Sequence, residues 1–175
     1  MPYLMSLSKK NNKRPVLKLP LTGWENGLEV LSVMGLLFTF ILVYQSWGIL
    51  PDRIPTHFGF TGQPDAWGNK ESLFFLPLIA LATYLLLTIV NRFPHTFNYP
   101  VKITEENAET QYIMARHLIA VLKVETIWLF AYIQWVTIEV ALGKATGLNN
   151  LFLPVLMVVM LGTIVVYFYK AREKR

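Results

Sequence analysis

Four long apolar segments dominate this sequence of 175 residues and limit what the chain can fold into. A helix needs about 20 residues, each rising about 1.5 Å, to cross the hydrocarbon core of a bilayer. We expect such helices at residues 28–49, 72–91, 104–142 and 151–169. The third segment is the longest and carries several charged residues, so we expect it to be partly cytoplasmic. The sequence therefore predicts an all-α integral membrane protein.

Composition and charge support this interpretation and predict an orientation. Hydrophobic residues make up 54% of the chain, charged residues only 15%, and the mean hydropathy is +0.41, more than a soluble domain needs. Most of the 16 Lys and Arg residues gather in a tail at 1–26, after the second helix, and around a basic end at 171–175. The positive-inside rule places both termini in the cytoplasm. We expect one four-helix domain at 27–170.

The placement of the basic residues also bears on partners. They lie at the ends of apolar segments rather than on one folded surface, which argues against nucleic acid. The expected partner is the lipid bilayer, and the basic ends could also bind a cytoplasmic protein. The chain has no cysteine, so a metal site would need His and carboxylates. The sequence indicates no cofactor.

The most polar stretch, which we call the signature segment, covers residues 50–70 between the first two helices. Its prolines and glycines and its Asp and Asn residues predict a compact, Ω-like extracytoplasmic loop. Its aromatic residues are expected to sit at the level of the lipid headgroups. The candidate ligand-binding residues come from this segment and from comparable depths on the first and third helices: His57, Asp65, Lys70, Arg53, Trp67, Gln45, Gln134 and Glu139.

The chemistry of these candidates leaves several roles open. A histidine beside carboxylates can belong to a structural hydrogen-bond network, bind a peptide or a small molecule, hold a metal, or transfer a proton. One histidine with two acids matches no established metal-ligand spacing, and His57 followed by Asp65 is no catalytic signature. We therefore assign no catalytic residue from the sequence.

Ionisable residues within or beside the apolar segments form a second group of candidates. Each costs about 2.5–3.5 kcal/mol when inserted at the centre of a membrane helix, which makes it a functional hypothesis. These intramembrane polar candidates are Glu29, Arg92, Arg116, Lys123 and Glu125.

Helical spacing suggests where the charged residues of the third helix point. Arg116, Lys123 and Gln134 fall close to one line and are expected to face the bundle interior. Lys123 is expected to face Glu29 of the first helix. Glu125 is expected to face Arg92, His95 or bound water. These residues fit either structural pairs between helices or a role coupled to protons or a ligand.

The signature segment has the pattern Leu50-Pro-x-x-Ile-Pro-Thr-His-Phe-x-x-x-Gly-x-Pro-Asp-x-Trp-Gly-x-Lys70. It closely resembles a bacterial membrane domain of unknown function, number 1648, which also forms part of the SdpI-type immunity proteins. The residues that carry the resemblance are Pro51, Ile54, Pro55, His57, Phe58, Gly62, Asp65, Trp67 and Lys70. The resemblance to SdpI-type proteins implies resistance to an exported toxic peptide and capture of a cytoplasmic repressor. Those proteins carry a further C-terminal segment that this sequence does not contain.

Three functions follow as hypotheses. The first is a membrane sensing or immunity-like protein that recognises an extracytoplasmic molecule through the signature segment. The second is a membrane enzyme acting on a lipid-linked or envelope substrate, with His57 as general base or ligand and Asp65 or Glu139 orienting it. The third is a small transporter subunit that relies on Lys123 and Glu125 and works as an oligomer.

Overall fold

The computed structural model describes residues 14–175, so the basic residues at the start of the predicted tail lie outside the described part. In chain order, the elements are α1 (Gly23–Ser46), β1 (Arg53–Phe58), β2 (Pro64–Asn69), the 3-10 helix η1 (Lys70–Phe74), α2 (Phe75–Val90), the 3-10 helix η2 (Pro94–Thr96), α3 (Ala108–Ala141) and α4 (Phe152–Glu173). The prediction of four helices long and apolar enough to cross a membrane is confirmed, with η1 and α2 together forming the second.

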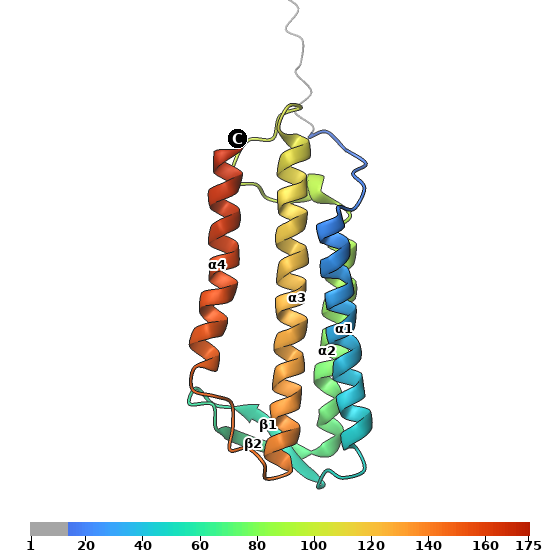
Figure 1. Cartoon of the computed structure of the whole chain (residues 1–175), viewed down its shortest axis with the longest axis vertical. Coiled ribbons are helices and arrows are strands. Elements are labelled where there is room, and N and C mark those ends of the chain that lie inside the picture. Colours follow the sequence, from blue (N-terminus) through green and yellow to red (C-terminus); the bar gives the residue numbers. More distant parts are fainter. Residues whose placement is uncertain (1–13) are drawn as a thin grey trace, which may run out of the picture.

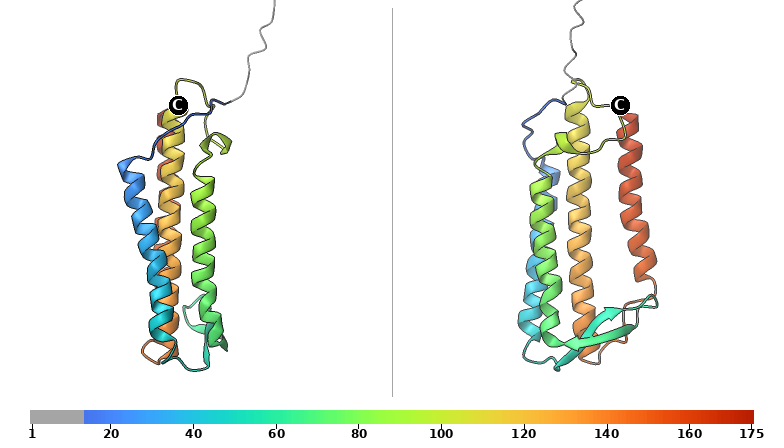
Figure 2. Two further views of the ribbon diagram at one scale, coloured as in Figure 1. Left: turned by 90° about the vertical axis from the view of Figure 1, so that its right-hand side faces the viewer. Right: turned by 180° about the vertical axis from the view of Figure 1, so that it is seen from behind.

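Helix α3 is the centre of the arrangement. It lies between α4 on one side and the α1–α2 pair on the other (Figure 1). It packs against each of the other three helices, whereas α4 packs mainly against α3. The two strands lie across one end of the bundle, which we call the hairpin end, and the C-terminus lies at the opposite, basic end (Figure 2).

The start of α1 shows how a short polar motif sets a helix boundary. The Oγ1 of Thr22 accepts a hydrogen bond from the backbone amide of Glu25, and the Glu25 carboxylate accepts one from the backbone amide of Thr22. This reciprocal capping box satisfies amides that the first turn leaves without helical partners. Helix α1 therefore begins at Gly23 rather than at residue 28, and α4 likewise continues past residue 169 to Glu173.

The signature segment is a β-hairpin instead of the expected Ω-like loop, so the chain is mostly helical with a small two-stranded sheet rather than all-α. Strands β1 and β2 pair antiparallel from Arg53 opposite Asn69 to Phe58 opposite Pro64, with irregular pairing after Pro55. Proline suggested a loop because it lacks an amide for a strand ladder. Both strands of a two-stranded sheet are edge strands, however, where proline is tolerated.

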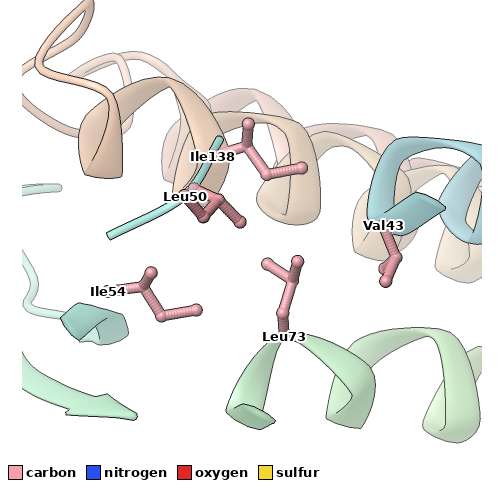
Figure 3. Packing of buried hydrophobic residues seen from close by; sticks show 5 residues of the cluster. All are labelled: Val43, Leu50, Ile54, Leu73 and Ile138. Carbon is pink, nitrogen blue, oxygen red and sulfur yellow. The ribbon is translucent and has the colours of Figure 1, made fainter. Parts of the chain in front are cut away.

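An apolar cluster fixes the hairpin to the bundle. Its buried members come from α1, the α1–β1 connection, β1, η1 and α3 (Figure 3): Val43, Leu50, Ile54, Leu73 and Ile138. Ile54 is completely buried, and burying such a side chain contributes about 1.5–3 kcal/mol. The aromatic Phe60, by contrast, is 90% exposed. A β1 side chain packed on the helices therefore anchors the hairpin within the described structure.

At the basic end, α3 holds the segment that precedes α1, which we call the strap (residues 14–22). The guanidinium of Arg116 donates to both carboxylate oxygens of Glu25, each at 2.8 Å. It also donates to the backbone carbonyls of Leu19 at 3.0 Å and Pro20 at 3.3 Å. Because Arg116 and Glu25 are both buried, this ion pair ties α1 and the strap to α3.

Candidate functional site

The hairpin covers a mostly apolar cavity of about 770 Å³ at its end of the bundle. Helices α2 and α3 and the start of α4 form the walls, and β1 with its turn forms the cover. Apolar side chains such as Ile79 and Ile133 line it, while the α3–α4 connection contributes Asn149 and Asn150. A cavity of this size, largely apolar with few polar groups, is typical of sites that bind small molecules.

Gln134 is the most deeply buried polar group of the cavity lining, with 1% of its surface exposed. Its Nε2 donates to the backbone carbonyl of Leu73 at 3.2 Å. Its Oε1 is buried and has no hydrogen-bond partner in the described structure. Buried carbonyl oxygens nearly always accept a hydrogen bond, so this atom is suited to accept one from a bound N–H or O–H group.

His57 and Asp65 form a pair on the hairpin, next to the cavity. Nδ1 of His57 lies 2.6 Å from Oδ1 of Asp65, and the two side chains are 69% and 54% exposed. A Cβ on Gly59 would lie 2.9 Å from the other carboxylate oxygen, so glycine allows the turn to approach Asp65. With Nδ1 facing the carboxylate, Nε2 of His57 remains to meet a polar group at the mouth of the cavity.

The hairpin turn is fastened to the connection between α3 and α4. The backbone amide of Leu148 donates to the carbonyl of Gly62 at 2.8 Å. Gly62 has a φ of +80°, a conformation that glycine adopts without strain. A Cβ on Gly147 would lie 2.2 Å from the Gly62 oxygen, so the two backbones approach closely only because both residues are glycines. This contact closes the cavity on the side of α4.

The remaining candidates of the signature segment lie elsewhere on the hairpin. Lys70 lies 3.9 Å from the carboxylate of Asp52 and over the ring of Trp47. Arg53 donates to the backbone carbonyl of Trp67, whose side chain is exposed. None of these residues lines the cavity. Their contacts hold the hairpin together near its junction with α1 and η1.

Of the three helical residues expected beside the signature segment, only Gln134 lines the cavity. Gln45 lies exposed on α1, and Glu139 lines a separate depression beside Gln63 and Lys144. The three residues were grouped because they lie at similar depths along their helices. Which neighbours a side chain contacts also depends on how its helix is rotated about its axis. The grouping of Gln45 and Glu139 with His57 is therefore corrected.

The expected line of polar residues on α3 does face inward, because Arg116, Lys123 and Gln134 are all buried. The predicted pair of Lys123 with Glu29 is also confirmed, at 2.5 Å between Nζ and Oε2. Lys123 donates in addition to Oγ1 of Thr88 at 3.0 Å and lies over the ring of Tyr84, whose hydroxyl donates to Glu29. The cluster joins α1, α2 and α3.

Glu125 and Arg92 do not meet as expected. The Glu125 carboxylate accepts a hydrogen bond from the hydroxyl of Thr163 on α4, at 2.6 Å, instead of meeting Arg92 or His95. Arg92 is exposed beyond the end of α2. Because α4 packs mainly on α3, it supplies the nearest polar group to this face of α3.

Sequence reasoning missed partners that are neutral or that lie at helix ends. Four such partners form hydrogen bonds to the charged candidates: Glu25 to Arg116, Tyr84 to Glu29, Thr88 to Lys123 and Thr163 to Glu125. The capping-box spacing of Thr22 and Glu25 is a sequence signal that could have located the start of α1. Among residues 14–175, no group of three or more His, Cys, Asp or Glu side chains is placed to hold a metal.

Comparison with known proteins finds similar sequences, but none of them has an assigned activity. Residues 34–81 match the family described as "Domain of unknown function (DUF1648)". An "Uncharacterized protein" from Archaeoglobus fulgidus is 33% identical over 101 residues, which cover 50% of this chain and 55% of that protein. The chain thus spans about half the length of this relative. No solved structure matches the chain.

The matched family segment contributes only part of the cavity. It includes β1, the hairpin turn, η1 and the first half of α2. Gln134 and the α3–α4 connection lie outside it and complete the lining. The site therefore combines the matched segment with residues from a distant part of the chain.

Proposed function

We propose that this protein is a membrane-embedded receptor, sensing or immunity-like, that binds an amphipathic molecule in the cavity under the hairpin. The unpartnered Oε1 of Gln134 carries the proposal, because Gln134 lines a mostly apolar cavity and this buried acceptor has no hydrogen-bond partner among the described residues. The ligand has an apolar body that fills the cavity and an N–H or O–H group that reaches Gln134. Its more polar end lies at the mouth, where His57 and Asp65 are exposed.

The proposed orientation puts the hairpin outside the cell and the basic end in the cytoplasm. It is supported by the Lys and Arg residues, which are concentrated at the basic end of the bundle. The proposed location, a bacterial plasma or inner membrane, rests on the resemblance of the signature segment to a bacterial membrane domain. With this orientation, the ligand comes from the extracytoplasmic side, as an exported peptide or a small envelope molecule does.

Single cysteines test the orientation, because the natural chain has none. We expect Thr61→Cys, in the hairpin turn, to react with a membrane-impermeant maleimide added to intact cells. We expect Arg175→Cys to react only after the cells are permeabilised. Labelling of Arg175→Cys but not Thr61→Cys in intact cells would reverse the orientation and exclude an extracytoplasmic ligand.

Helix α3 offers a physical route by which occupancy of the cavity reaches the cytoplasmic partner in this proposal. It carries Gln134 in the cavity and Arg116 at the basic end. Arg116 in turn holds the strap through the carbonyls of Leu19 and Pro20. A ligand that shifts α3 would change how the basic strap is presented to a cytoplasmic protein.

We expect Gln134→Leu to weaken binding of N-dansyl-dodecylamine, a fluorescent probe with an apolar chain and one N–H donor, by about tenfold or more. Losing a hydrogen bond to a buried acceptor costs about 1–3 kcal/mol, and 1.4 kcal/mol is tenfold. Binding is measured by fluorescence titration of the full chain in lipid nanodiscs, with empty nanodiscs subtracted. Gln45→Leu is the matched control, since the same change on the exposed face of α1 should leave the Kd unchanged.

The mouth of the cavity is tested with the same probe. We expect His57→Ala to weaken binding, whereas His95→Ala, at the basic end, should not. Equal affinity of Gln134→Leu, Gln45→Leu and the natural protein would contradict the proposed receptor function. Retained folding is checked for every variant by size-exclusion chromatography and thermal unfolding.

The His57–Asp65 pair favours a second candidate function, a membrane enzyme. A carboxylate at Nδ1 orients an imidazole so that Nε2 can accept a proton, as a general base does. Such an enzyme would convert a lipid-linked or envelope substrate in the cavity. Turnover of a co-purified lipid, abolished by His57→Ala while binding persists, would favour this candidate over the receptor.

The structure favours the transporter hypothesis less. Lys123, one of its two required residues, is held by Glu29, Thr88 and the ring of Tyr84. Such contacts are those of a structural pair between helices. The other required residue, Glu125, does not contact Lys123 but accepts a hydrogen bond from Thr163 on α4.

A further inference from the structure

A second hollow lies between α3 and α4, along a different side of α3 from the cavity under the hairpin. It is an open groove of about 410 Å³. From α3, the groove is lined by Glu125, Trp128, Leu129 and Tyr132, the α4 side is apolar, from Phe152 to Met160, and the α3–α4 connection adds Asn149 and Leu151. Within residues 14–175, no helix other than α3 and α4 contributes to its lining.

Glu125 is the one acidic group in the groove, and it lies near the middle of α3. Its Oε1 accepts a hydrogen bond from Thr163, while its Oε2 is buried and has no hydrogen-bond partner in the described structure. No Lys, Arg or His among residues 14–175 forms an ion pair with it. Glu25 and Glu29 differ, because each is paired with a basic residue of α3. An ionised carboxylate at this depth is stabilised by a nearby cation, which offsets the cost of its desolvation.

The rest of the groove indicates which kind of cation fits. Inorganic cations such as Mg²⁺ and Ca²⁺ require about six or more oxygen ligands, and the groove has too few oxygens beside Glu125. Aromatic rings instead lie on the same side of α3. The faces of Trp and Tyr attract organic cations within about 6 Å. The groove therefore favours a cation whose charge is surrounded by apolar groups.

The aromatic side chains are held in place by their own contacts. The indole Nε1 of Trp128 donates to the backbone carbonyl of Leu31 at 3.1 Å, and its ring stacks on Phe38. The ring of Tyr132 lies 4.9 Å from that of Phe152 at the start of α4. The walls beside Glu125 are thus preorganised, which lowers the entropy lost on binding.

We propose that the α3–α4 groove is a binding site for a lipophilic organic cation, an amine or onium compound, with Glu125 as its counter-ion and Trp128 and Tyr132 as its aromatic walls. The ligand reaches the groove from the surrounding lipid. The groove shares Asn149 and Phe152 with the cavity under the hairpin, but Glu125, Trp128 and Tyr132 do not line that cavity. The proposal does not depend on the function proposed for the cavity.

Binding of methyltriphenylphosphonium to the full chain in nanodiscs tests the proposal. We expect saturable binding, measured by isothermal titration calorimetry against empty nanodiscs. We expect Glu125→Gln, which keeps the shape but removes the charge, to raise the Kd at least about tenfold. Glu139→Gln is the matched control and should bind as the natural protein does, because Glu139 lies in a separate depression.

A second measurement does not rely on any variant. We expect the neutral isostere 1,1,1-triphenylethane not to compete with methyltriphenylphosphonium for the natural protein. Competition at equal affinity would overturn the proposal, because the groove would then select shape rather than charge. An unchanged Kd for a folded Glu125→Gln would overturn it as well. Loss of N-dansyl-dodecylamine binding in Gln134→Leu tests only the other cavity, so the two results are distinguishable.

Discussion

Replacing Arg116 by alanine is expected to lower the free energy of unfolding by about 3–5 kcal/mol, because it leaves the buried carboxylate of Glu25 without a cation. The same change also removes the donors for the carbonyls of Leu19 and Pro20. The loss is measured by titrating the protein in mixed micelles with sodium dodecyl sulfate. Arg92→Ala is the control, since Arg92 is exposed and its removal should change stability by less than about 0.5 kcal/mol.

A lysine at position 116 separates the contribution of the positive charge to stability from that of the guanidinium geometry. Arg116→Lys keeps a cation but loses the two parallel hydrogen bonds to Glu25, so we expect only part of the stability to return. Hydrogen exchange of the strap should rise in Arg116→Ala, because the carbonyls of Leu19 and Pro20 lose their hydrogen bonds to α3. A stable Arg116→Ala protein with an unchanged strap would contradict the role of this ion pair.

Replacing Lys123 by methionine is the second change with a large expected effect, a loss of about 2 kcal/mol, which is less than for Arg116 because the Glu29 side chain is 36% exposed. The methionine fills the buried space, but Glu29 loses its counter-ion and Thr88 loses its donor. The hydroxyl of Tyr84 is then the remaining partner of the Glu29 carboxylate among the contacts of this cluster. Unfolding in mixed micelles gives the loss directly.

The double variant Lys123→Met with Glu29→Leu shows whether the pair itself stabilises the bundle. Apolar replacement of a whole buried pair is often neutral or stabilising, since no uncompensated charge remains. We therefore expect the double variant to recover most of the stability that Lys123→Met loses. Lys144→Met is the control outside the cluster and should have little effect. A double variant less stable than Lys123→Met would show that the charges act independently.

The sequence predicted some contacts of the helices but not others. The pair of Lys123 with Glu29 was predictable, because opposite charges in two apolar segments are stabilised when they pair. The partner of Glu125 was not, because Thr163 is neutral and stands in an apolar segment without any charge signal. Glu25 was also missed, since the start of α1 was placed beyond it.

The signature segment shows a different limit. Its prolines and glycines indicated a turn-rich segment, and the turn at Gly62 is present. The pairing of β1 with β2 was not predicted, because proline is compatible with both loops and edge strands. Anchoring by Ile54 depends on contacts with Leu73 of η1 and with Ile138 of α3, and α3 lies far along the chain.

By itself, the sequence determined that four helices can cross a membrane and that Arg116, Lys123 and Gln134 face inward. Apolar length and helical periodicity are local properties, so they can be read along the chain. Only the tertiary structure decided that Gln134 lies in a cavity under the hairpin and that Glu125 lies in a separate groove beside α4. These surroundings depend on how each helix is rotated and which helices it touches, and the packing of distant segments sets both.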